Sequence, residues 1–279
     1  MKRFILCISL LLLLAIPARA GEPEPTWIQV APVRAVSTRS LGAVLADIDS
    51  RLVATGLGSS QTYRSADLGT WAHEGAHGVN SRIRNTYGRG TEADNAFYVL
   101  WGRAAIIAEP QPVTLQDAAR YVPLALRGET YKTYMVDSLS DWNEAPLYAL
   151  DEWTAYVNGA IHNLSMAEQG RSIGDGSGDL LFTAESAMHS LSVVIAVDAR
   201  LKRDPQFRYD DTQLRLYVAW NWNRMMQLFA DGRQYRQFQD PMPYYRVFSH
   251  GEAGKDWRQW SRHYFGADWV AAVMDTKQD

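Results

Sequence analysis

The segment TWAHEGAHGVN, residues 70–80, contains two histidines four positions apart and a glutamate directly after the first. Successive residues of a helix are about 100° apart, so His73 and His77 project from the same face, one turn from each other. Two imidazole nitrogens held in this way can bind one zinc ion at about 2.0–2.1 Å. The carboxylate of Glu74 falls to one side of the pair, where it can take a proton from a metal-bound water. The segment therefore predicts a hydrolytic metal site.

The rest of the same helix indicates a cleft rather than an ordinary exposed surface. Asn80 and Arg84 continue the stripe of His73 and His77, whereas the flanks and the back carry small or apolar residues. Such a helix can pack closely by its back. Its polar stripe lacks the mixture of lysine and glutamate that is typical of a solvated face.

Residues His73-Glu74-Gly75-Ala76-His77 resemble the His-Glu-x-x-His motif of the zincin metallopeptidases. The resemblance covers this helix clearly and the rest of the chain only in outline. It implies a zinc hydrolase, normally a peptidase, that binds one zinc ion through His73 and His77 and uses Glu74 as the general base. It also implies a third ligand farther along the chain.

Zincin subgroups differ in this third ligand. The metzincin extension requires a glycine and a histidine where this chain has Asn80 and Ile83, so that subgroup is excluded. The aspzincins use Gly-Thr-x-Asp, and the segment GTEAD places Asp94 one position too late, which leaves Asp94 as the alternative ligand. The gluzincins take a glutamate from a later helix, for which Glu152 is the best candidate.

Glu152 lies in the segment PLYALDEWTAYVNG, residues 146–159, which begins with a proline suited to the first turn of a helix. Tyr148, Glu152 and Tyr156 share one stripe at four-residue spacing, with small residues beside them. A glutamate among aromatic and small residues is expected to turn inward, and an inward carboxylate needs a cation or hydrogen bonds. Zinc would meet this need, and the alternative is a salt bridge, for instance to Arg84.

The motif does not show which residues orient the histidines. The best-known gluzincin pattern has an aspartate four residues after the ligand glutamate, where this chain has Tyr156. Orientation must come from elsewhere, for example from Asn80 or a backbone carbonyl. Asp151 points about 100° away from Glu152 and is expected in the outer shell or in solvent.

Hydrolysis of an amide also needs a hydrogen-bond donor for the oxyanion, which zincins commonly supply as a tyrosine or histidine beside the metal. Tyr148, one turn before Glu152, is the first candidate and Tyr134 is the second, although either can be a packing residue. Zincins typically bind an extended peptide at a strand edge near the metal, and the segment 95–110 is a candidate for that edge.

Helices and a hairpin must position these residues. Apolar periodicity predicts a helix over residues 40–56 and another over about 67–85, and aromatic and β-branched runs predict a hairpin over 95–110. Further helices are predicted over residues 115–123, 144–161, 180–201, 212–232 and 256–275. The predicted fold class is α+β, mainly α. A zincin-like catalytic region over 21–170 is expected to carry a helical C-terminal region, 171–279, packed on it.

Charge gives no support to nucleic-acid binding. The chain has 28 lysines and arginines against 31 aspartates and glutamates, a net charge of −3, and the basic residues are scattered. A nucleic-acid partner normally requires a concentrated basic face.

The first twenty residues are predicted to be a cleaved signal peptide, because a Lys-Arg start is followed by an apolar stretch and the small-residue pattern Ala-Arg-Ala. The only cysteine, Cys7, lies inside that segment, so disulfides and cysteine ligands are excluded from the exported chain. Such a chain suits a periplasm, or secretion beyond it. No later stretch is expected to span a bilayer, and no stable membrane anchor is expected after cleavage.

Together these features predict an exported zinc-dependent metallopeptidase that acts on a peptide or protein substrate. Two alternatives remain open. One is a catalytically silent binding or scaffold protein of zincin fold, and the other is a zinc amidase that acts on cell-wall peptides.

Overall fold

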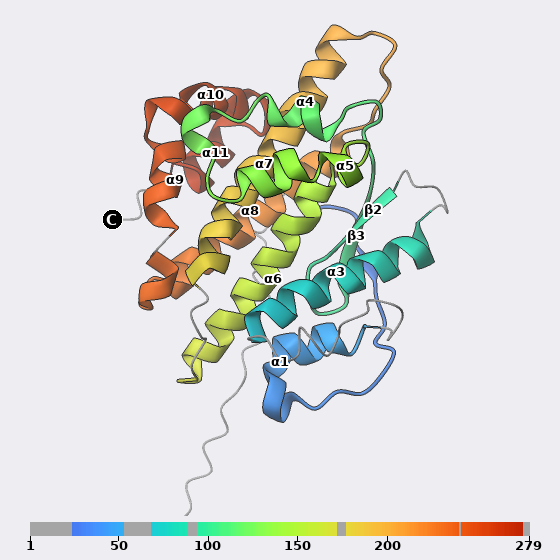
Figure 1. Cartoon of the computed structure of the whole chain (residues 1–279), viewed down its shortest axis with the longest axis vertical. Coiled ribbons are helices and arrows are strands. Elements are labelled where there is room, and N and C mark those ends of the chain that lie inside the picture. Colours follow the sequence, from blue (N-terminus) through green and yellow to red (C-terminus); the bar gives the residue numbers. More distant parts are fainter. Residues whose placement is uncertain (1–23, 53–67, 89–93, 172–176, 240, 276–279) are drawn as a thin grey trace, which may run out of the picture.

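The computed structural model describes residues 24–52, 68–88, 94–171, 177–239 and 241–275 (Figure 1). Helices dominate, and one small antiparallel sheet lies beside them. The predicted fold class, α+β and mainly α, is confirmed at this level. The predicted signal peptide, residues 1–20, lies outside the described residues, as does the end of the first predicted helix, residues 53–56.

The two helices nearest the predicted metal site are α3 (Leu68–Tyr87) and α6 (Tyr148–Glu168). α3 confirms the helix predicted over 67–85. α6 confirms a helix in the segment 144–161, but it begins at Tyr148 and continues to Glu168. The other helices in the described part of the chain are α1 (Thr38–Asp49), α4 (Leu115–Ala119), α5 (Leu139–Trp142), α7 (Ser177–Arg203), α8 (Thr212–Gly232), α9 (Met242–Ser249), α10 (Lys255–Tyr264) and α11 (Ala267–Val273). Short turns lie between them: η1 (Leu124–Leu126), η3 (Arg236–Gln239) and η4 (Glu252–Gly254) are 3₁₀-helical, and η2 (Thr133–Asp137) is π-helical.

Several predicted helices end differently from their predictions. The helix predicted over 40–56 ends at Asp49, and residues 50–52 after it are not helical. The segment 256–275 forms two helices, because Gly266 between them has a φ of 102°, which is incompatible with a continuous right-handed helix. The helix predicted over 115–123 ends at Ala119. Pro123 contributes to this early end, since a proline disfavours helical backbone at the residue before it.

The sheet consists of β1 (Ile28–Gln29), β2 (Asp94–Tyr98) and β3 (Arg103–Ala108), in the order β1-β3-β2. β2 and β3 are antiparallel neighbours with Tyr98 opposite Ala104, which confirms the predicted hairpin. The connecting turn is tight, and its residues 100–102 all have positive φ. The N–H of Trp101 in this turn donates to Oδ2 of Asp47 at 2.9 Å, which ties the hairpin to α1.

Two hydrophobic clusters hold these elements together. The smaller lies between α1, α3 and residues of the sheet. The larger begins at other residues of the sheet and continues through α6, α7 and α8 to the C-terminal helices. α3, which belongs to the smaller cluster, packs along α6, which belongs to the larger one (Figure 1). The larger cluster takes residues from both sides of the boundary predicted at residue 170, and the division into two regions stays a prediction.

α7 has the length and composition of a membrane span but is a core helix. Its segment Leu180–Arg203 is long and apolar enough to cross a bilayer, but 89% of the most apolar 18-residue stretch in it is buried inside the protein. The expectation that no later stretch would be long and apolar enough to cross a bilayer was therefore wrong for this helix. It is apolar on most sides because α4, α6 and α8 pack around it.

Candidate metal centre

Small residues let α3 and α6 approach closely beside the two histidines. A Cβ atom at Gly159 would lie 3.2 Å from the carbonyl oxygen of Gly69 and 3.5 Å from Cβ of His73. The start of α6 is held by Glu109, whose Oε2 accepts a hydrogen bond from the N–H of Leu147 at 3.1 Å. This close packing brings the first turns of α6 to the motif on α3.

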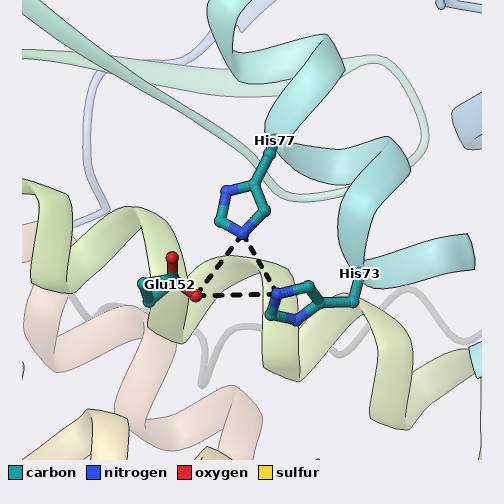
Figure 2. A group of neighbouring side chains, drawn as sticks. All are labelled: His73, His77 and Glu152. Carbon is teal, nitrogen blue, oxygen red and sulfur yellow. Dashed lines mark hydrogen bonds and ion pairs between the residues drawn. The ribbon is translucent and has the colours of Figure 1, made fainter. Parts of the chain in front are cut away.

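His73, His77 and Glu152 point toward one another across this contact (Figure 2). Nε2 of His73 and Nε2 of His77 are 3.1 Å apart. Oε2 of Glu152 lies 3.6 Å from the first of these nitrogens and 3.5 Å from the second. Among the described histidine and acidic side chains, these three form a group that could hold a metal ion, because their ligand atoms all lie within 4.8 Å of one another.

The triangle formed by these three atoms fits one face of a tetrahedral site. Ligand atoms at about 2.0–2.1 Å from a tetrahedral ion lie about 3.3–3.4 Å from each other. The separations here are 3.1, 3.5 and 3.6 Å. Oε2 of Glu152 is also buried with no hydrogen-bond partner among the described residues, because both imidazole nitrogens are too distant for a hydrogen bond. A buried carboxylate oxygen in this position needs a cation, and the three side chains could hold one.

The charges of the cluster also favour a cation. Burial acts to raise the pKa of Glu152, but His77 and His73 outweigh it and hold the pKa of that carboxyl well below its usual range. Burial acts to lower the pKa of His77, but the carboxylates of Asp151 and Glu152 outweigh it and raise the pKa of the imidazole above its usual value. The glutamate is therefore ionised at neutral pH, and a metal ion must compete with a proton for His77.

Asp151 faces the ring nitrogen of His77 that points away from the cluster, with Oδ1 3.2 Å from Nδ1. The same oxygen accepts a hydrogen bond from the side-chain amide of Asn80, which lies one turn after His77. Asp151 was predicted in the outer shell or in solvent, and the structure places it against His77, outside the group of His73, His77 and Glu152. Asn80, predicted as a possible orienting residue, reaches His77 through Asp151.

Tyr148, the first predicted oxyanion donor, lies in the first turn of α6 beside Glu152. Burial and the Glu152 carboxylate raise the pKa of Tyr148 well above its usual range, so its hydroxyl stays protonated and can donate. The ring stacks on Trp142 with centroids 4.7 Å apart and an interplanar angle of 5°. Tyr148 therefore contacts both Glu152 and Trp142.

Tyr134, the second predicted donor, contacts the site through Tyr156. Their hydroxyl oxygens are 2.5 Å apart, and the Tyr156 ring packs on the His73 ring with centroids 4.2 Å apart. The contact of Tyr156 with His73 was not predicted. The four-residue stripe of α6 already contained Tyr156, but no local pattern shows which residue of another helix such a stripe will meet.

Access to the cluster differs among its members. The side chains of His73 and Glu152 are 10% and 9% exposed, whereas that of His77 is 21% exposed. Glu74, the predicted general base, follows His73 on α3 and is half-buried. The cluster is therefore open to solvent chiefly at His77.

Two alternatives were left open by the sequence: Asp94 as the third ligand, and Arg84 as the ion-pair partner of Glu152. Asp94 is buried at the start of β2 and is not part of the group. Glu152 makes its ion pairs with the two histidines, whereas the charge of Arg84 acts on Glu109. Burial raises the pKa of Glu109 to about 7, although hydrogen bonds from Leu147 and Asn95 oppose the shift.

Fold and site together define a mainly helical α+β protein with a His-His-Glu group that could hold one metal ion. Comparison of the chain with protein-family models, with curated proteins and with solved structures gives no match. The interpretation of the site therefore depends on the motif and its geometry.

Proposed function

We propose that this chain is an exported, zinc-dependent metallopeptidase of zincin type, with His73, His77 and Glu152 as the ligands of one zinc ion. The observation that carries the proposal is the convergence of a glutamate from α6 on the two histidines of the His-Glu-x-x-His motif. Three protein ligands leave the fourth tetrahedral position for water or substrate, as in catalytic zinc sites. Structural zinc sites use four protein ligands, so this group favours a catalytic role.

The residues around the ligands supply the remaining steps. Zinc, when bound, polarises the scissile carbonyl and makes the attacking water more acidic. Glu74 takes the proton of that water and delivers it to the leaving amine. Tyr148 donates a hydrogen bond to the oxyanion, and Tyr134 is the second candidate for this role.

The proposed substrate is a peptide or protein outside the cytoplasm. The signal peptide predicted over residues 1–20 supports export to the periplasm or beyond. Scattered basic residues and a net charge of −3 support a partner other than nucleic acid.

Metal content and turnover of the Glu74→Gln variant test this proposal. Protein purified without added zinc is analysed for metal, and parent and variant are incubated with a diverse peptide library whose products are identified by mass spectrometry. We expect about one zinc per chain in both proteins. Turnover should fall about 10²–10⁴-fold in the variant, because the general base is lost while the ligands remain.

Other results separate the alternatives. Zinc at about one per chain without turnover of any peptide would favour the catalytically silent scaffold. Turnover of cell-wall peptides alone would favour the amidase. A parent protein that fails to retain zinc, or that retains it equally in the His77→Ala variant, would contradict the metal centre itself.

A further inference from the structure

His77 is the member of the cluster whose outward ring nitrogen has an acidic neighbour. Nδ1 lies 3.2 Å from Oδ1 of Asp151, while Nε2 of the same ring faces His73 and Glu152. A carboxylate at Nδ1 can only accept, so it favours the tautomer with the proton on Nδ1. That tautomer leaves the lone pair on Nε2, the nitrogen that faces the cluster.

Asp151 is itself held in place by a chain of hydrogen bonds. The amide nitrogen of Asn80 donates to Oδ1 of Asp151, and the amide oxygen of Asn80 accepts from the backbone N–H of Tyr98 at 2.6 Å. The backbone carbonyl of Tyr98 accepts from Nδ2 of Asn158 at 2.8 Å. Asp151 is thus linked through Asn80 to the backbone of Tyr98 in β2, whose N–H and carbonyl are both hydrogen-bonded to asparagine side chains.

Asp151 is a candidate for a role that the sequence left unassigned, that of the residue that orients a histidine of the cluster. The best-known gluzincin pattern supplies an aspartate four residues after the ligand glutamate, and that position is Tyr156 here. Tyr156 packs on the face of His73 and supplies no carboxylate. The acidic neighbour in this chain comes instead from the residue directly before Glu152 on α6.

We infer that Asp151, fixed by Asn80, is a positioning residue of the metal centre that sets the tautomer and the ring orientation of His77. The inference rests on the proposed zinc site. It assigns to one turn of α6 both a metal ligand, Glu152, and the partner that orients another ligand. Outer-shell partners of this kind typically change metal affinity about 10–100-fold when they are removed.

Zinc affinity, measured by competition with a chelator of known affinity at fixed pH, tests the inference. Asp151→Ala should weaken zinc binding about 10–100-fold, and Asn80→Ala should weaken it by a smaller factor because Asp151 remains but is no longer held. Asp151→Asn keeps an oxygen that can accept from Nδ1–H, so its loss should be smaller than that of Asp151→Ala. Glu168→Gln, at the exposed end of α6, is the matched control and should bind zinc as the parent does.

A tautomer measurement distinguishes positioning from a general loss of structure. In ¹⁵N-histidine-labelled zinc-loaded protein, we expect His77 with its proton on Nδ1 and its metal on Nε2, and we expect Asp151→Ala to broaden or shift these signals while those of His73 stay in place. If Asp151→Ala does not fold, the same comparison with Asp151→Asn decides.

The outcomes separate this inference from the proposed function. Zinc affinities within twofold of the parent in both Asp151 variants, with zinc binding abolished by His77→Ala, would overturn the positioning role and leave the metal centre intact. Zinc binding that survives His77→Ala would overturn both.

Discussion

His73 and His77 are equivalent in the sequence motif but differ in their surroundings. Nδ1 of His77 faces Asp151, whereas Nδ1 of His73 is buried with no hydrogen-bond partner among the described residues. The ring of His73 is positioned by its contact with Tyr156. One histidine therefore has a polar contact at its outward nitrogen and the other is held by packing, a difference that the spacing of the two residues does not contain.

Glu109 should make the stability of the protein depend on pH near neutrality. Burial raises the pKa of its carboxyl from an ordinary value of 4.5 to about 7. Between these values the folded state binds more protons than the unfolded state, so the free energy of unfolding falls as pH rises through this window. The stabilising contribution is complete below about pH 4.5 and is lost above about pH 7, a difference of about 1–3 kcal/mol.

The Glu109→Gln variant measures this contribution. Urea unfolding of parent and variant at several pH values from about 5 to 8 should show stability falling with pH in the parent relative to the variant. Glu144→Gln, at an exposed site, is the control and should follow the parent. Parallel curves for the parent and Glu109→Gln would contradict the prediction.

At the scale of elements, the closeness of α3 and α6 decides whether a metal site can form. Gly159→Ala should lower the free energy of unfolding by a net of up to about 2 kcal/mol, because overpacking strain of about 1–3 kcal/mol is offset by only about 1 kcal/mol of helix propensity gained by alanine. The added methyl group would lie 3.2 Å from the carbonyl oxygen of Gly69 and would push the helices apart. Urea unfolding and zinc titration check this, and zinc affinity should fall as well.

Glu168→Ala, on the exposed end of the same helix, serves as the control for Gly159→Ala. It should change neither stability nor zinc affinity by a measurable amount. A Gly159→Ala variant that kept the zinc affinity of the parent would show that α3 and α6 need no such close approach.

The hairpin is the element whose predicted role changes most. It was a candidate edge for an extended substrate, and β2 is an edge strand of the sheet. At Tyr98, however, Asn80 and Asn158 already bind the backbone N–H and carbonyl. A substrate strand cannot pair with Tyr98 while these bonds persist. The hairpin at this point instead holds Asn80, which binds Asp151 beside His77.

For the whole molecule, zinc should stabilise the fold, because its ligands come from two helices that pack together only in the folded chain. At a zinc concentration of about 100 times the Kd, a ligand specific for the folded state adds about 2.7 kcal/mol, or about 5–10 °C in Tm for a chain of this size. Differential scanning calorimetry before and after chelation measures the shift. The His77→Ala variant should show none, and an equal shift in that variant would point to a different binding site.

The sequence by itself determined the local parts of this protein. The spacing of His73, Glu74 and His77 placed two imidazoles on one helix face. Apolar periodicity predicted α3, α7 and α8 with ends close to those of the structure, and it predicted α6 without the last turns that reach Glu168. The β2–β3 hairpin was equally visible, because its aromatic and β-branched runs flank a short turn. These features depend on residues within a few turns of one another, and such interactions leave a periodic pattern in the chain.

The tertiary structure decided which distant residues meet. The periodic pattern predicted that Glu152 faces inward. Only the packing of α3 on α6 brought Glu152, rather than Asp94, next to the two histidines. The same packing put Asp151 at His77 and Tyr156 at His73, and the surrounding helices made α7 a buried core helix although its composition matches a membrane span. Such contacts depend on the angle and distance between helices. Those are set by side-chain volume at the contact, including the absence of side chains at Gly69 and Gly159, and no local pattern in the sequence encodes them.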